Sequence, residues 1–150
     1  MDRLLPTPED THALGVALGR AMFPGSVLAL VGDLGAGKTA LVQGLAEGLG
    51  ATGRVQSPTF TLVQPHPDGR LPLWHADWYR LRDAGEAGAL GLFELGEEGV
   101  VAVEWADRFP ELLPDDHLRV VLHDHGAGRL AEVTAAGPRH APLVEVAGAG

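Results

Sequence analysis

Apolar residues in the first third of the chain predict a buried strand followed by an amphipathic helix. Residues 26–31 read Ser-Val-Leu-Ala-Leu-Val, a nearly continuous apolar run with the length of a buried strand. Further on, Leu41, Leu45 and Leu49 recur every fourth residue, which places them on one face of a helix. Gly50 follows as a helix stop signal. The turn between the strand and the helix is short and rich in glycine.

Other patterns predict further elements on both sides of this strand and helix. Thr7 is a suitable N-cap for an earlier helix that continues to about residue 21, because Pro8 fits the first helical position. Residues 83–98 are acidic and glycine-rich and predict two short helical turns. Further strands are predicted at residues 4–5, 59–63, 71–75, 99–103, 117–122, 129–134 and 143–146, with reverse turns at 65–69 and 124–128.

The glycine-rich turn carries the strongest chemical signal in the chain. Residues 32–39 read Gly-Asp-Leu-Gly-Ala-Gly-Lys-Thr, a full match to the phosphate-binding pattern G-x-x-x-x-G-K-[ST]. A strand before the pattern and a helix after it are the context that this pattern requires. Lys38 is the only lysine in the chain, and its compact ammonium suits the β- and γ-phosphates of a nucleotide. The candidate phosphate-binding residues are Asp33, Gly35, Ala36, Gly37, Lys38, Thr39 and Ala40.

The elements after residue 58 determine the predicted fold class. They form hairpins rather than repeated strand–helix crossovers, so few helices are expected to cover the sheet. We therefore predict an α/β fold, a P-loop NTPase-like three-layer domain with a mixed sheet, few covering helices and antiparallel hairpins in the second half. A chain of 150 residues is expected to form a single domain, residues 1–150. Residues 137–150 are expected to be a loosely ordered tail.

Two acidic residues at strand ends are candidates for magnesium chemistry. Magnesium prefers oxygen ligands, which here would be one or two carboxylates beside the Thr39 hydroxyl. Glu104 directly follows the apolar run at residues 100–103, and Asp77 follows another predicted strand. An acid at the carboxyl end of a core strand points into the phosphate-binding crevice. Either acid could instead cap a helix, and Asp77 could cap one that begins at Trp78.

The segment Ser57-Pro58-Thr59 has two open interpretations. It could be a switch-like segment in which a hydroxyl reaches the metal or the γ-phosphate. It could equally be an ordinary turn before a strand.

Composition excludes several classes of protein. The net charge of −9 argues against a broad basic surface for nucleic acid, although a small basic patch stays open. The absence of cysteine excludes disulfides and thiolate metal sites, and it fits the cytosol. No apolar run approaches the ~20 residues of a membrane span, and the N-terminus lacks the pattern of a signal peptide. We therefore expect a cytoplasmic protein without a membrane segment.

Four motifs in this order resemble the bacterial TsaE family, the ATPase component of the machinery that makes threonylcarbamoyladenosine in tRNA. They are the phosphate-binding pattern at 32–39, Ser-Pro-Thr-Phe-Thr-Leu at 57–62, His-Ala-Asp-Trp-Tyr-Arg-Leu at 75–81 and Val-Glu-Trp-Ala-Asp-Arg at 103–108. The resemblance covers about residues 5–135. The first motif is generic, whereas the other three together are specific. Trp78 departs from the family, which more often has Leu or another apolar residue there.

The resemblance implies roles for individual residues at a catalytic site. Lys38 and the loop amides would hold the phosphates of ATP or ADP. Thr39 and Glu104 would ligate Mg²⁺. Asp77 would lie near the metal or the catalytic water, and Thr59 would belong to a switch-like segment. Lys38, Asp77, Glu104 and Thr59 are therefore the expected catalytic residues.

The resemblance also implies residues that flank the nucleotide and protein partners. Trp105 would lie beside the nucleotide, and Thr11 and Arg129 would flank the adenine. Members of the family work with a TsaD–TsaB complex and use ATP hydrolysis to reset it between rounds, while a separate enzyme makes the threonylcarbamoyl-adenylate. The negative net charge agrees with action on protein, and direct contact with tRNA stays open.

Three other functions are alternatives to an ATPase. A small-molecule kinase needs a lid with several arginines, and Arg80 and Arg82 are the nearest approach to one. A GTPase needs the guanine-reading motif Asn-Lys-x-Asp, but the chain has no asparagine and no second lysine. A nucleotide-dependent binding module without turnover would lack a catalytic acid, whereas Asp77 and Glu104 are both present. Measurement of phosphate release with and without partner proteins would decide the last alternative.

Overall fold

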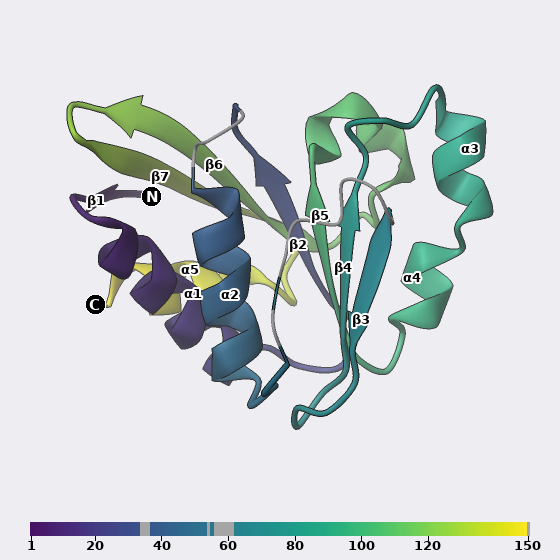
Figure 1. The fold of residues 1–150 in the computed structure, drawn as a ribbon, viewed down its shortest axis with the longest axis horizontal. Helices are drawn as coiled ribbons and strands as arrows, with labels where there is room; N and C mark the ends of the chain where they lie inside the picture. Colours follow the sequence, from purple (N-terminus) through teal and green to yellow (C-terminus); the bar gives the residue numbers. More distant parts are fainter. Residues whose placement is uncertain (34–36, 54, 56–61, 150) are drawn as a thin grey trace.

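A mixed β-sheet forms the centre of the molecule (Figure 1). The computed structural model describes residues 1–33, 37–53, 55 and 62–149. Within these residues the sheet has seven strands in the order β1-β7-β6-β2-β5-β4-β3. The strands are β1 (Asp2–Leu5), β2 (Ser26–Val31), β3 (Val63–His66), β4 (Leu73–Asp77), β5 (Val100–Glu104), β6 (His117–His125) and β7 (Gly128–Ala136). The helices are α1 (Pro8–Ala21), α2 (Lys38–Gly48), α3 (Ala84–Ala89), α4 (Leu92–Leu95) and α5 (Ala141–Gly148), with 3₁₀ turns η1 (Ala106–Arg108) and η2 (Pro110–Leu112).

The middle of the sheet is parallel and its two margins are antiparallel. β2 runs parallel to β5 and β6, and β5 runs parallel to β4. At one margin β3 pairs antiparallel with β4. At the other margin β6 and β7 form an antiparallel hairpin, and β1 pairs antiparallel with β7. The predicted α/β fold, with its mixed sheet and antiparallel hairpins, is confirmed.

The sheet separates two apolar clusters, which gives the domain three layers. α1, α2 and α5 cover one face, and α3, α4 and the 3₁₀ turns lie against the other (Figure 1). Along β2, Leu28 and Leu30 belong to the first cluster, whereas Val27 and Ala29 belong to the second. This alternation follows from the pleat of a strand that is buried on both faces. Within the described ranges, no helix combines the length and the apolar character needed to cross a bilayer.

The N-terminus of α1 is capped as its sequence predicts. The Thr7 hydroxyl accepts a hydrogen bond from the Asp10 backbone N–H at 3.2 Å, and the Asp10 carboxylate accepts one from the Thr7 N–H at 3.0 Å. This reciprocal pair satisfies two helix-end donors. It fixes the start of α1 and so places Thr11, which is 1% exposed, one turn along the helix.

α1 and α2 pack backbone against backbone. Gly15 and Gly19 of α1 face Gly44 and Gly48 of α2, and a Cβ built on any of the four would lie closer than 3.0 Å to backbone of the other helix. Only glycine permits such an approach. The contact holds the first turn of α2, which carries Lys38, at a set distance from α1.

The strand predicted at residues 143–146 is wrong, because Ala141–Gly148 form helix α5. Leu143 and Ala147 lie one helical turn apart and are both buried, on the side of the sheet that α1 covers. His140, the residue before the helix, is fully buried. Its Nε2 accepts a hydrogen bond from the Val27 N–H at 3.0 Å, which joins the start of α5 to β2.

Some strand boundaries also differ from those predicted. β3 continues through Pro65 to His66, so the turn predicted at 65–69 begins later. A proline is tolerated there because β3 is an edge strand. β4 and β5 each include an acid, Asp77 and Glu104, as the last strand residue. Both acids are therefore held by the sheet itself rather than by the loops that follow.

Candidate functional site

The candidate site lies where β2, β4 and β5 end, beside the first turn of α2. Parallel strands end at the same edge of a sheet, and ligands of open α/β sheets bind at that edge. In the register of the sheet, Glu104 pairs with Leu30 of β2 on one side and with Asp77 of β4 on the other. The sequence segments that carry the candidate residues are therefore brought together by strand pairing.

Lys38 is the first residue of α2 and is only 5% exposed. Its Nζ donates a hydrogen bond to the Gly32 carbonyl at 2.7 Å. Burial lowers the pKa of Lys38, although the nearby charges of Glu104, Asp77, Asp107 and Asp33 oppose that shift. The lysine is thus a buried cation surrounded by acids.

Asp77 and Glu104 are each only 3% exposed. Alternation along the strands explains their direction, because Leu73 of β4 and Ala102 of β5 belong to the cluster beneath α2. The acids lie two or four residues further along the same strands and face the same side. Both carboxylates therefore point toward Lys38 rather than toward α3 and α4.

The alternative that Asp77 caps a helix beginning at Trp78 is wrong, because residues 78–82 are not helical. Asp77 Oδ1 instead accepts a hydrogen bond from the Tyr79 N–H at 2.8 Å, in the turn that follows β4. The Glu104 carboxylate has a different partner: its Oε2 lies 2.5 Å from Nε2 of His75.

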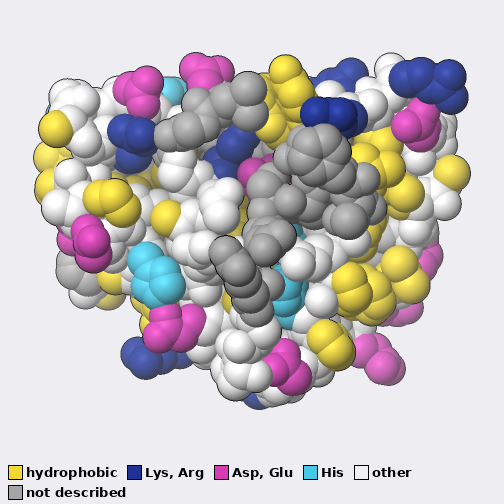
Figure 2. Space-filling model, viewed as in Figure 1, with side chains coloured by type: hydrophobic (Ala, Val, Ile, Leu, Met, Phe, Trp, Pro, Cys, Tyr) yellow, Lys and Arg dark blue, Asp and Glu magenta, His cyan; other side chains and the backbone are white. Residues whose placement is uncertain are grey.

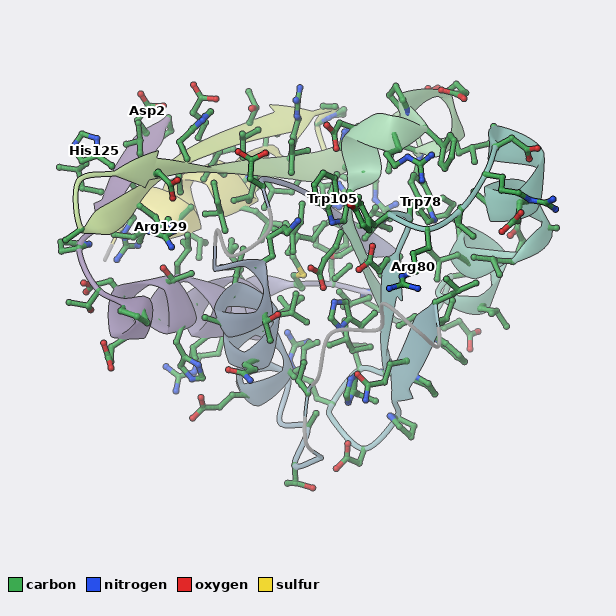
Figure 3. All side chains as sticks on the ribbon, turned by 45° about the horizontal axis from the view of Figure 1, so that its top comes forward. Asp2, Trp78, Arg80, Trp105, His125 and Arg129 are labelled. Carbon is green, nitrogen blue, oxygen red and sulfur yellow. The ribbon has the colours of Figure 1, made fainter. Side chains whose placement is uncertain are left out.

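Trp105 covers the lysine. The centre of its ring lies 3.9 Å from Lys38 Nζ and 4.7 Å from the centre of the Tyr79 ring. Trp105 has a left-handed backbone conformation, with φ 59°, which turns the chain sharply at the end of β5. Figure 3 shows Trp105 near the middle of the molecule, between Arg129 on one side and Arg80 on the other.

Arg108 joins the two loops that leave the acid-bearing strands. It lies in η1, after β5, and its guanidinium donates to three carbonyls of the loop after β4. The donor–acceptor distances are 2.8 Å to Trp78, 2.6 Å to Tyr79 and 2.5 Å to Leu81. Loops that carry functional residues are commonly held in this way by a rigid contact at their base.

Thr11 and Arg129 lie beside the start of α2. They line a pocket of about 90 Å³ together with Gly37, Ala40 and the turn between β6 and β7. Arg129 lies 3.4 Å from Asp124 across the β6–β7 hairpin. Four residues predicted to contact a nucleotide, from three separate segments, therefore share one pocket.

The remaining predicted residues divide into described and undescribed ones. Gly37 has φ 96° and is the N-cap of α2, and Thr39 is half-buried in its first turn. Asp33 is exposed. Gly35, Ala36 and Thr59 lie outside the described residues, so the loop amides and the switch-like segment stay predictions.

A larger hollow of about 390 Å³ adjoins the site. It is lined by Gly32, Asp33 and Trp105 together with Asp107 and residues 121–124. Figure 2 shows basic and acidic side chains in contact in the upper middle of the molecular surface, next to the undescribed residues. Chemically, a buried ammonium at a helix N-terminus with two carboxylates opposite it can hold a polyanion together with a hard cation.

His75, Asp107 and Arg108 are site residues without a role predicted from the sequence. All three lie in or beside the motifs at 75–81 and 103–108, so their positions were available. Their contacts could not be read from the sequence, because these contacts join separate elements. They link β4 or its loop to β5, or the end of β5 to α2. A histidine two residues before a strand-end acid, as in His75 and Asp77, was the one usable signal in the sequence.

Comparison with known proteins identifies the family. Residues 5–131 match the family model TsaE, described as threonylcarbamoyl adenosine biosynthesis protein TsaE. The chain is 46% identical over 140 residues to the tRNA threonylcarbamoyladenosine biosynthesis protein TsaE of Bacillus subtilis, covering 92% of this chain and 87% of that protein. It is 45% identical over 137 residues to the protein of that name from a Nostoc species, covering 87% and 83% of the two chains.

A solved structure agrees with this similarity. The fold superimposes on the crystal structure of Bacillus subtilis YdiB with a TM-score of 0.82 and 37% sequence identity, covering 99% of this chain and 93% of that one. The family match and the identity to these relatives both extend across the sheet and the candidate site. The chain therefore belongs to the TsaE family.

Proposed function

We propose that this protein binds ATP with Mg²⁺ and hydrolyses ATP in support of threonylcarbamoyladenosine formation in tRNA. One observation carries the proposal: Lys38, at the start of α2, lies over Trp105 and faces two buried carboxylates, Asp77 and Glu104. A cation at a helix N-terminus suits the nucleotide phosphates. The biosynthetic role is supported by the names of the two relatives reported above, both of which are tRNA threonylcarbamoyladenosine biosynthesis proteins.

The chain's own residues divide the work between phosphate and metal. Lys38 would leave the Gly32 carbonyl and bind the β- and γ-phosphates, with the amides that follow Asp33. Thr39 and Glu104 would hold Mg²⁺, which would neutralise phosphate charge. Asp77 would orient the attacking water, because its carboxylate lies on the strand next to Glu104.

The donor set fits a magnesium ion that arrives with a nucleotide. Within the part of the chain that the structure describes, no group of three or more His, Asp or Glu side chains is placed to hold a metal ion. Magnesium in nucleotide sites is usually bound by one or two carboxylates together with the substrate phosphates. Glu104 and the Thr39 hydroxyl would provide oxygen ligands of this type.

The adenine would occupy the pocket that Thr11 and Arg129 line. That pocket is also lined by Gly37, which lies in the phosphate-binding pattern, and by Ala40, which directly follows it. Thr59 would complete the site as part of a switch-like segment. A TsaD–TsaB complex is the proposed partner and the cytoplasm the proposed location, which suits a chain without cysteine.

The test is calorimetric binding of ATP and ADP, followed by phosphate release with and without a TsaD–TsaB complex. Lys38→Ala and Thr39→Ala should lose nucleotide binding or turnover but keep the thermal melt of the wild type, since neither side chain belongs to the apolar clusters. Arg20→Ala, which removes an exposed cation from α1, is the matched control. Unchanged ATP affinity in folded Lys38→Ala would contradict the proposal. Binding without phosphate release under any condition would favour the binding-module alternative.

A further inference from the structure

His75 is a buried imidazole in contact with one of the two site carboxylates. It lies on β4, two residues before Asp77, and is fully buried. Its Nε2 lies 2.5 Å from Oε2 of Glu104, which is on the neighbouring strand β5. Residue 75 pairs with Ala102 in the sheet, so the imidazole reaches along β5 by one pleat to meet Glu104.

The contact determines which ring nitrogen carries hydrogen. An ionised carboxylate can only accept hydrogen bonds, so Nε2 of His75 donates to Oε2 of Glu104. The other ring nitrogen, Nδ1, has no hydrogen-bond partner among the described residues. Among the described residues, the hydrogen bond of the His75 imidazole is therefore the one to Glu104.

A single strong donor has a definite effect on a buried carboxylate. Holding Oε2 restricts rotation of the carboxylate group and leaves Oε1 as the oxygen that can turn toward Lys38 and α2. Residues that bind a metal are commonly oriented by such an outer partner, and loss of that partner weakens metal binding. The short contact, with Glu104 only 3% exposed, meets the geometric conditions for this effect.

We infer that His75 is a positioning residue, which orients Glu104 so that one carboxylate oxygen is available to the magnesium ion of the bound nucleotide. The inference rests on the proposed function, because it assigns Glu104 to that ion. It differs from a purely structural role, in which the imidazole would only fill space beside β4. A structural role predicts lower stability, whereas a positioning role predicts a specific loss of magnesium dependence.

A second buried histidine provides a matched control. His66 lies on β3, one strand further from Glu104, and is 4% exposed. Its Nε2 also has no hydrogen-bond partner within the described residues. His66→Phe therefore removes a comparable buried imidazole without removing a contact of Glu104.

The experiment compares nucleotide binding with and without Mg²⁺ in the wild type, His75→Phe, His75→Gln, His75→Asn and His66→Phe. ADP affinity is measured by calorimetry, Mg²⁺ is titrated at fixed ADP, and each variant is melted without ligand. His75→Phe should raise the Mg²⁺ concentration needed for half-maximal effect by roughly 10- to 100-fold. Metal-free ADP affinity should stay within about twofold of the wild type, because the phosphate-binding residues are unchanged.

The two amide variants, His75→Gln and His75→Asn, distinguish the position of the N–H donor from the volume of the side chain. Glutamine carries an N–H donor at about the reach of Nε2, whereas asparagine ends near the reach of Nδ1. His75→Gln should recover most of the magnesium dependence and His75→Asn should not. If His75→Phe does not fold, the difference between these two polar variants still decides the question.

Several outcomes would overturn the inference. They are equal magnesium dependence in His75→Phe and the wild type, equal loss in the glutamine and asparagine variants, or the same loss in His66→Phe. A wild-type protein that binds ADP with normal magnesium dependence while all His75 variants match it would refute the role of His75 alone. A wild-type protein without nucleotide binding, or without any effect of Mg²⁺, would refute the proposed function and the inference together.

Discussion

The ammonium of Lys38 lies 3.9 Å from the centre of the Trp105 ring, which makes the two residues a cation–π pair at the end of the sheet. Phosphates bind an ammonium more strongly than a ring face does, because they carry full negative charge. An arriving nucleotide would therefore compete with Trp105 for Lys38, and the tryptophan would change its surroundings.

This competition makes Trp105 a reporter of the site. We expect the tryptophan fluorescence of the wild type to change when ADP is added, and the change to be lost in Trp105→Phe. Trp74→Phe is the control, because Trp74 packs against the cluster on the far face of the sheet. A signal that persists in Trp105→Phe would place the responsive tryptophan elsewhere. Titration of the three proteins with ADP is sufficient to decide.

Glu104→Gln should separate metal binding from nucleotide binding. The substitution keeps an oxygen that can accept from His75, but it removes the charge and one ionised oxygen ligand. We expect magnesium-dependent hydrolysis to fall by tenfold or more, since loss of one good electrostatic partner costs about 1.4 kcal/mol or more. Metal-free ADP binding should change much less. Normal hydrolysis in Glu104→Gln would mean that Asp77, and not Glu104, is the carboxylate that binds the metal.

The glycine contact between α1 and α2 predicts an asymmetric pair of alanine variants. A Cβ at Gly44 would collide with the backbone of His12, so Gly44→Ala should destabilise the protein by about 1–3 kcal/mol. Gly88 of α3 has nothing within 4 Å of an added Cβ, so Gly88→Ala should be neutral or stabilising by up to about 1 kcal/mol. Urea unfolding of the two variants beside the wild type measures both effects. Equal stability of the two would mean that α1 and α2 can separate at no cost.

His140 predicts a pH dependence of stability. Burial lowers the pKa of His140 below its ordinary value of 6.5, an effect that exceeds the opposing influence of Asp116. The unfolded chain therefore takes up a proton at a higher pH than the folded one, and the stabilisation present above about pH 6.5 is lost as the pH falls. Protonation would also remove the acceptor that Nε2 offers to the Val27 N–H.

Urea unfolding between pH 5 and pH 8 tests this expectation. The free energy of unfolding of the wild type should fall below about pH 6.5, and His140→Gln should show a shallower fall. His123→Gln, at an exposed position of β6, should follow the wild type. Asp116 affects stability in a different pH range. Burial raises the pKa of Asp116, but hydrogen bonds from Arg139 and His140 outweigh that effect and lower the pKa. Its contribution is therefore lost only in more acidic solution. Identical slopes for the wild type and His140→Gln would show that another group is responsible.

Local patterns were sufficient to predict the part of the molecule that carries the phosphate-binding turn. Residues 26–31 and the Leu41, Leu45 and Leu49 face are determined by spacing alone, and the Thr7 cap is determined by four adjacent residues. α5 was missed because Leu143, Val144 and Val146 favour a strand by type. Its helical form depends on burial of Leu143 and Ala147 in the cluster beneath α1, which is a tertiary effect.

The sequence was sufficient to predict which residues form the candidate site, but not which of them contact one another. Lys38, Asp77 and Glu104 each stand at an element boundary, which a sequence displays. The hydrogen bond between His75 and Glu104 joins residues 29 positions apart, and it exists only in the observed register of β4 and β5. The left-handed backbone of Trp105, which turns the ring onto Lys38, has no sequence signal in a residue other than glycine or asparagine.

Arg108 has a consequence for how the site can move. Its guanidinium holds three carbonyls of the loop after β4 while its own backbone belongs to the turn after β5. Asp77 and Glu104 lie at the bases of these two segments, so neither loop can open alone without breaking three hydrogen bonds to a charged donor. The positions of the two acids are thus coupled through Arg108. A partner protein that displaced either loop would therefore shift Asp77 and Glu104 together.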